Sequence, residues 1–242
     1  MYHLPLTLET PAANLALDEA LLDAAVDGEL SGEVLRLWEP AEYFVVLGRS
    51  SAVTEVNAGA CRADGVPVLR RPSGGATIVA GQGCLMYAVI LDLERRPELR
   101  FVDRAHQWVL GRNAAALTAL GIDVSCAGTS DLTLRQTGDD DEPPRKFSGN
   151  SLRLKRHRLL YHGTILYDFP LERISRWLGT PARRPDYRGE RGHEDFVTNF
   201  PASREAIVAA MVDAWEATTT LLKWPRERTE ELTAGRYASL AW

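Results

Sequence analysis

Two arginines and a pair of glycines stand close together within residues 68–79, between two stretches of β-prone residues. The turn reads Arg70-Arg71-Pro72-Ser73-Gly74-Gly75-Ala76. Adjacent glycines let the backbone approach a ligand closely and point its N–H groups at it. The arginines add fixed positive charge and forked donors that suit a carboxylate or a phosphate. The pattern predicts a hairpin that holds an anion; the alternative is a tight hairpin with solvated arginines.

A second block, residues 145–168, combines a lysine, small residues and a histidine. Its first half reads Arg145-Lys146-Phe147-Ser148-Gly149-Asn150-Ser151-Leu152-Arg153, and its second half contains His162-Gly163-Thr164. Both halves are rich in β-prone residues and are predicted to form strands. The small residues at 148–150 allow another backbone to come close to the first strand.

The chain contains three cysteines, Cys61, Cys84 and Cys126. Their odd number, their wide spacing and the absence of a CxxC pair argue against a disulfide framework and against a structural zinc site. We therefore expect a reducing compartment and no metal-binding cysteines.

The composition is that of a globular protein that can bury a full core. The 242 residues are 45% hydrophobic and 25% charged, with a formal net charge of −5 and a pI near 5.6. General nucleic-acid binders are usually basic, so we expect no nucleic-acid partner, although an acidic chain can hold a local basic pocket. The sequence shows no secretory signal and no apolar run long enough to span a membrane. We predict a cytoplasmic protein without a membrane partner.

The elements that must position these residues alternate between helices and groups of strands. Helices are predicted at residues 11–26, 101–120, 171–178 and 203–222, and strands at 34–38, 43–49, 84–91, 124–126, 131–134 and within 145–168. Asp18 and Glu19 fall near the middle of the first helix and are expected on its solvated face. The polar stretch 138–144 is predicted to be a hairpin tip. Because no linker is visible, we predict one α+β domain with a mixed, mostly antiparallel sheet and flanking helices.

Five segments, taken in order, make the chain resemble the lipoate–protein ligase A family, within the wider biotin/lipoate protein ligase catalytic domain superfamily. They are residues 14–19, 46–49 with 55–57, 70–75, 146–151 with 162–166, and 197–200. Residues 70–75 are similar to the family's RRxSGG signature, and the fourth segment to its KxSG…HGTLL block. The resemblance covers nearly the whole chain. It implies a single catalytic domain over residues 1–242 without the C-terminal accessory domain of many ligases.

The resemblance implies that lipoate and ATP, with Mg²⁺, give lipoyl-adenylate, whose acyl group then passes to a lysine of a carrier domain. Lys146 is the expected catalytic residue, because its ammonium can bridge the acyl carbonyl and the α-phosphate, where negative charge grows. The alternative is a surface lysine beside an acidic turn. His162 is expected to pack or to hydrogen-bond in its strand. The residues expected to bind substrate or nucleotide are Arg49, Arg70, Arg71, Ser73, Gly74, Gly75, Ala76, Cys84, Ser148, Gly149, His162, Gly163 and Thr164.

The chain departs from the family pattern directly after the glycine turn. The family usually has a His-Asp pair and then Gly-Asn, whereas this chain has Ala80-Gly81-Gln82-Gly83-Cys84. The third glycine of the turn is replaced by Ala76. Polar contacts to the nucleotide, the metal or the acyl group are therefore expected to differ.

These departures support an alternative reaction. Octanoyltransferases of the same superfamily use no ATP and pass octanoate from acyl carrier protein to the carrier lysine through a cysteine thiolate. Cys126 is the candidate nucleophile, because it lies upstream of the lysine block; otherwise it is a small core residue. A third alternative is a non-catalytic domain that binds an acyl chain or a carrier.

The resemblance also implies the partners. The acceptor would be a lipoyl carrier domain of a 2-oxoacid dehydrogenase or the H protein of glycine cleavage. Acyl carrier protein would be the donor in the octanoyltransferase alternative, and an accessory subunit is a further candidate partner for lipoate activation.

Overall fold

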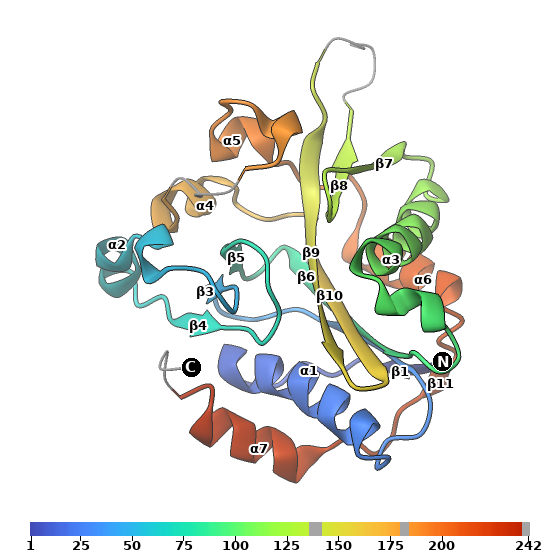
Figure 1. Cartoon of the computed structure of the whole chain (residues 1–242). Helices are drawn as coiled ribbons and strands as arrows, with labels where there is room; N and C mark the ends of the chain where they lie inside the picture. The colour runs from blue at the N-terminus through green and yellow to red at the C-terminus, as the bar shows by residue number, and fades with distance from the viewer. Residues whose placement is uncertain (136–141, 180–183, 239–242) are drawn as a thin grey trace.

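The computed structural model describes residues 1–135, 142–179 and 184–238, and its strands form two sheets (Figure 1). The strand order of the large sheet is β11 (Thr219–Thr220), β1 (Tyr2–Leu4), β2 (Val34–Trp38), β6 (Cys84–Asp92), β10 (Arg158–Leu166), β9 (Arg145–Lys155), β8 (Asp131–Leu134) and β7 (Val124–Ala127). The order of the small sheet is β4 (Val68–Arg70), β3 (Phe44–Leu47) and β5 (Ile78–Ala80).

Antiparallel pairing dominates the large sheet, and the small sheet is mixed. In the large sheet β1 is parallel to β11 and to β2, and the other described pairs are antiparallel. In the small sheet β3 is parallel to β4 and antiparallel to β5. The predicted α+β class with a mixed, mostly antiparallel sheet is confirmed, but the division into two sheets was not predicted.

Helices cover both faces of the large sheet (Figure 1). The helices are α1 (Pro11–Val26), α2 (Ala58–Ala63), α3 (Val102–Thr118), α4 (Glu172–Trp177), α5 (His193–Phe196), α6 (Arg204–Ala214) and α7 (Arg226–Gly235), with short 3₁₀ turns at Val53–Glu55, Pro97–Arg100 and Asp186–Arg188. Among the described residues, no helix combines the length and the apolar character needed to cross a bilayer. Most of the stretch 138–144, predicted as a hairpin tip, lies outside the described residues.

The two faces of the large sheet have different neighbours. Successive side chains of a strand point to opposite faces. On β10, Tyr161 lies in the core under α3 and α6, whereas Leu160 packs with α1 and Leu166 with the small sheet. The intervening residues His162 and Thr164 therefore point toward α1 and the small sheet, which is the face where the glycine turn lies.

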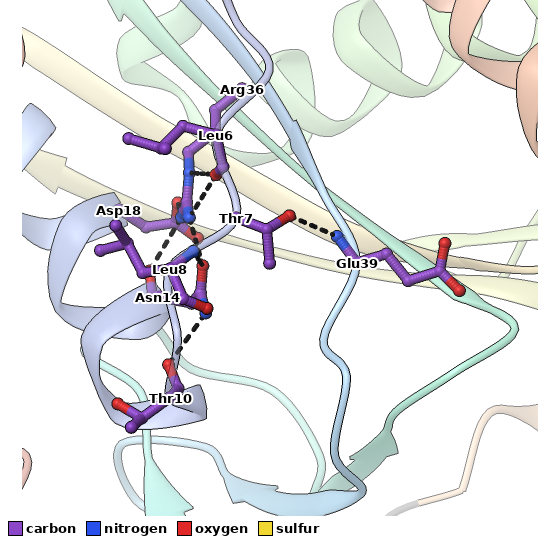
Figure 2. A network of polar contacts seen from close by, with 8 residues as sticks. All are labelled: Leu6, Thr7, Leu8, Thr10, Asn14, Asp18, Arg36 and Glu39. Atoms are coloured by element: carbon purple, nitrogen blue, oxygen red, sulfur yellow. Dashed lines mark hydrogen bonds and ion pairs between the residues drawn. The ribbon is translucent and has the colours of Figure 1, made fainter.

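A buried arginine joins α1 to the large sheet. Arg36 on β2 is fully buried, and Figure 2 shows its guanidinium enclosed by residues of α1 and of the segment before it. One terminal nitrogen pairs with Asp18 at 2.5 Å, and the other donates to the Asn14 side chain at 2.6 Å and to the Leu6 carbonyl at 2.9 Å. Burial raises the pKa of Asp18, and the Arg36 charge opposes that shift. The ion pair fixes the first helix against the second strand.

The expectation that Asp18 and Glu19 face solvent was wrong, because each has a buried partner. Asp18 pairs with Arg36, and Glu19 is bound by Arg236 at 2.5 Å and by the Tyr237 hydroxyl at 2.8 Å. Arg236 and Tyr237 directly follow α7, which lies along the outer side of α1 (Figure 1). The C-terminal helix thus completes the burial of α1.

Replacing Asp18 by alanine is expected to lower the free energy of unfolding by about 3–5 kcal/mol, because it leaves the Arg36 charge buried and unpaired. Asp23→Ala is the matched control: Asp23 is on the same helix, but its Lys155 partner is 38% exposed. We expect a loss of about 0–1 kcal/mol there. Urea denaturation measures both, and equal losses would contradict the assignment.

Candidate active site

The glycine turn that follows β4 is shaped by one buried guanidinium. Arg71 donates from Nε to the Ser73 hydroxyl at 3.1 Å and to the Gly74 carbonyl at 3.1 Å. Its two terminal nitrogens donate to the carbonyls of Gly74, Ala76 and Val46. Burial lowers the pKa of Arg71 to about 10, so the group stays charged at neutral pH. Arg71 therefore supports the turn from beneath.

Arg70 has the same kind of role for the neighbouring loop. Its guanidinium donates to the carbonyls of Gly48, Arg49 and Ser51 at 2.8, 3.1 and 2.9 Å. The two arginines of the predicted anion site thus bind loop carbonyls. Arg49, by contrast, is exposed, and its guanidinium forms no hydrogen bond or ion pair with the residues that the structure describes.

The two loops cross at a pair of glycines. A Cβ atom on Gly48 would lie 2.0 Å from the Gly75 carbonyl oxygen, so only glycine fits there. Gly75 has a φ of 87°, a value that disfavours other residues. The Ser51 hydroxyl also donates to the Gly75 carbonyl at 3.3 Å.

Three side chains of the β9–β10 hairpin attach the glycine turn to the large sheet. The Ser151 hydroxyl donates to the Gly74 carbonyl at 2.8 Å, Arg153 donates to the Pro72 carbonyl at 2.9 Å, and His162 Nε2 lies 2.5 Å from the Ser73 hydroxyl oxygen. Burial, assisted by the Arg71 charge, lowers the pKa of His162 to about 3. The imidazole is neutral at physiological pH, and it shares a hydrogen bond with the Ser73 hydroxyl, whose oxygen also accepts one from Arg71 Nε.

A β-bulge places the Lys146 side chain on the face of the large sheet that contacts the glycine turn. Lys146 is paired with Thr133 and Ser148 with Leu132, so Phe147 is an extra residue in β9. In a regular strand, residues 146 and 149 would point to opposite faces, and the extra residue reverses this. A Cβ atom on Gly149 would lie 2.8 Å from Lys146 Nζ, which shows that the ammonium lies over the glycine.

Asp131 holds the ammonium in this position. Its Oδ1 lies 2.7 Å from Lys146 Nζ, and its Oδ2 accepts a hydrogen bond from the Tyr187 hydroxyl at 2.8 Å. Thr164, on β10, accepts a bond from the Gly149 N–H at 3.4 Å. Gly149 lies two residues from Ser151, or about 6.6 Å along the strand. The Lys146 ammonium and the glycine turn are therefore neighbours on one face.

Two predicted site residues, Ser148 and Gly163, contact groups on the face of the large sheet opposite the glycine turn. The Ser148 hydroxyl and Asn150 exchange hydrogen bonds, and Asn150 also accepts one from Tyr87 at 2.5 Å. Gly163 lies directly beneath: a Cβ atom there would be 1.9 Å from Asn150 Oδ1. Ser148 and Gly163 thus belong to a polar layer under the site, and their predicted role in binding stays a prediction.

The cysteines differ sharply in position. Cys84 is fully buried at the start of β6, in the core next to the small sheet, and burial raises its pKa. Cys126 is exposed on the edge strand β7. It is paired with Leu132, whose side chain lies in the core under α3, so alternation places Cys126 and Asp131 on opposite faces.

Residues 80–84, where the sequence departs from the family pattern, are tightly packed against neighbouring segments. Gly81 lies against the Tyr43 ring and Gly83 against the Asp168 carbonyl, so close that a Cβ atom would be 2.1 Å from either. The Gly83 N–H donates to the Glu39 carboxylate at 2.8 Å. The Tyr43 ring, the Asp168 carbonyl and the Glu39 carboxylate thus surround the two glycines between Ala80 and Cys84.

Sequence reasoning did not select four residues of this site: Asp131, Ser151, Arg153 and Tyr187. Ser151 and Arg153 share the strand parity of Gly149, which could have identified them once the strand was recognised. Asp131 and Tyr187 are 56 residues apart, and no local pattern connects them.

No group of three His, Cys, Asp or Glu side chains that could hold a metal ion is found among the described residues. Mg²⁺ is commonly bound by one or two carboxylates together with substrate phosphates. The single carboxylate of Asp131 beside Lys146 fits that mode. Lys146 is partly exposed and Arg49 is exposed, so both cations are accessible to a ligand.

The stability of the protein is expected to depend on His162 at mildly acidic pH. Its pKa is lowered from 6.5 to about 3 in the folded protein, so the unfolded chain binds this proton more readily. The stabilisation is present above about pH 6.5 and is lost as the pH falls toward 3. From pH 7 to pH 5 the loss is about 2 kcal/mol. His162→Gln should remove this part of the pH dependence in urea denaturation, and an unchanged pH dependence would contradict the assignment.

Comparison with known proteins now identifies the family. The model of the lipoyl protein ligase A/B catalytic domain matches residues 10–218. A protein of Aeropyrum pernix named "Putative lipoate-protein ligase A" is 30% identical over 212 residues, which are 88% of this chain and 73% of that protein. The Schizosaccharomyces pombe protein of the same name is 25% identical over 228 residues, and this chain spans only 58% of its length.

Solved structures share the fold. A bi-partite lipoate protein ligase of Thermoplasma acidophilum, studied with its E2 lipoyl domain, superposes with a TM-score of 0.78 at 19% identity over 100% of this chain and 96% of that chain. A lipoate-protein ligase A bound with ATP gives a TM-score of 0.75 at 18% identity over 100% and 97%. On the strength of the family match, the chain is an enzyme that belongs to the lipoyl protein ligase A/B catalytic domain family.

Proposed function

We propose that this chain activates lipoate with ATP and transfers the lipoyl group to a lysine of a lipoyl carrier domain. In the first step a lipoate carboxylate oxygen attacks the α-phosphorus of ATP, and pyrophosphate leaves. In the second step the neutral amine of the carrier lysine attacks the acyl carbonyl carbon. The bond to AMP breaks, AMP keeps the electron pair, and the new amide nitrogen loses a proton.

The observation that carries this proposal is the position of Lys146. Its ammonium lies over Gly149, on the same face as the glycine turn. Both steps concentrate negative charge on oxygens around the α-phosphorus or the acyl carbonyl. A preorganised cation at that point stabilises the transition state more than the ground state. The permanent charge of Arg71 beneath the turn adds to the field without direct contact.

The relatives support the choice of substrates. One lipoate-protein ligase A structure is bound with ATP, and one T. acidophilum structure contains lipoic acid. The T. acidophilum ligase was studied together with an E2 lipoyl domain, which supports a carrier of the 2-oxoacid dehydrogenase type as the acceptor here. Asp131 is the residue that would hold Mg²⁺, which when bound would neutralise part of the phosphate charge.

Octanoyl transfer through Cys126 is the second candidate, because this thiol is exposed while Cys61 and Cys84 are buried. Two observations count against it. Cys126 and Asp131 lie on opposite faces of the sheet, and partial burial raises the pKa of Cys126, although the thiolate is the nucleophile. The ligase reaction is therefore the better supported of the two.

A donor assay separates these reactions. A lipoyl carrier domain is incubated with lipoate, ATP and Mg²⁺, or with octanoyl-acyl carrier protein alone, or with synthetic lipoyl-adenylate, and its mass is measured. We expect acylation from lipoate with ATP and release of pyrophosphate. Acylation from octanoyl-acyl carrier protein alone, lost in Cys126→Ser, would instead establish the transferase. No acylation from any donor would refute both.

Removing the Lys146 ammonium is expected to reduce kcat for carrier lipoylation by about 10²–10³-fold, the size of effect seen when one preorganised donor is lost. Lys155→Ala is the matched control, because Lys155 is on the same strand and is paired with Asp23. That variant should keep full activity. Full activity of Lys146→Ala would contradict the proposed mechanism.

Gly149→Ala is expected to displace the Lys146 ammonium without unfolding the protein. The added methyl group would meet Nζ at 2.8 Å, and a flexible side-chain end can move aside. A shift of about 1 Å in a catalytic group can cost roughly 100-fold in rate. We expect such a fall in kcat with little change in the melting temperature. Unchanged kcat would show that Lys146 does not act from this position.

A further inference from the structure

The two oxygens of the Asp131 carboxylate have different partners. Oδ1 lies 2.7 Å from Lys146 Nζ, and Oδ2 accepts a hydrogen bond from the Tyr187 hydroxyl at 2.8 Å. The Asp131 side chain is only 9% exposed, so water competes weakly for either oxygen. The carboxylate thus connects Lys146 to a residue 41 positions further along the chain.

The Tyr187 ring is held firmly in place. It packs against Phe196 with 5.3 Å between ring centroids, and a Cβ atom on Gly128 would lie 3.3 Å from its edge. Arg191 donates to the Tyr187 carbonyl at 2.6 Å and also lies over the Phe196 ring. The hydroxyl is therefore a donor with a fixed origin and a fixed direction.

The Tyr187 hydrogen bond restricts how the Asp131 carboxylate can move. A carboxylate bound at one oxygen can still turn about its own axis, whereas one bound at both oxygens cannot. Lys146 needs such a fixed partner, because its ammonium ends a flexible four-carbon stem and is 26% exposed.

We infer that Tyr187 is a positioning residue for acyl activation: it fixes the Asp131 carboxylate, which in turn holds the Lys146 ammonium over Gly149. This inference rests on the proposed function of Lys146. It extends that function to the segment between α4 and α5, which contributes a residue that acts on the reaction only through Asp131.

The test is Tyr187→Phe, which keeps the packed ring and removes the hydroxyl. We expect kcat for pyrophosphate release with lipoate and ATP to fall about tenfold, the effect of losing one hydrogen bond to a charged group. The KM for lipoate should change less than about twofold, because ground-state binding is untouched. The matched control is Tyr167→Phe, which removes a hydroxyl that donates to the Glu39 carboxylate at 2.8 Å. It should leave kcat unchanged.

A double-mutant cycle decides whether Tyr187 acts through Asp131. In an Asp131→Asn background, Tyr187→Phe should change kcat by less than about twofold, because the carboxylate that it orients is gone. Equal losses in both backgrounds, or a Tyr187→Phe enzyme that behaves like Tyr167→Phe, would overturn the inference.

Two variants distinguish failure of the proposed function from failure of the role of Tyr187. Full activity of Lys146→Ala would refute the proposed function together with the inference. An inactive Lys146→Ala enzyme combined with a fully active Tyr187→Phe enzyme would refute only the inference.

Discussion

The buried guanidinium of Arg71 is the interaction on which the candidate site depends. Its three nitrogens all bind groups of the glycine turn or of β3, so one side chain sets the shape of the turn. Its charge persists at neutral pH, and the Glu55 carboxylate balances it only at longer range. The turn therefore carries a permanent positive potential under its glycines. An anionic ligand would benefit from that field even though the guanidinium itself is occupied.

The cations around the site have separate tasks. Arg70 and Arg71 support two loops from below, where their donors replace the backbone partners that tight turns lack. Lys146 and Arg49 retain access to solvent and can approach a phosphate. The buried arginines keep the loops rigid, while the accessible cations remain free to approach a ligand. Rigidity matters because a preorganised site loses little energy to reorganisation during the reaction.

Much of this arrangement could be predicted from the sequence, and the errors have identifiable causes. The helix at 11–26 and the strands within 145–168 followed from local periodicity, and the α+β class followed from their order. The burial of Asp18 and Glu19 could not be predicted, because their partners Arg36 and Tyr237 lie outside the first helix in the sequence. The bulge at Phe147 was also invisible, since it depends on the register between β8 and β9. The resemblance to the family's lysine block identified Lys146 as a candidate, but only pairing across strands revealed Asp131 beside it.

The position of β1 has a consequence for how the protein matures. The first strand lies between β2 and β11, so residues near 2 and 219 must meet before the large sheet is complete. The contacts of Glu19 form later still, because its partners are residues 236 and 237. Until those residues have been synthesised, the Glu19 carboxylate on the first helix lacks the partners that it has in the folded protein. Closing such long loops is slow, and the exposed edge of β1 is meanwhile open to wrong partners.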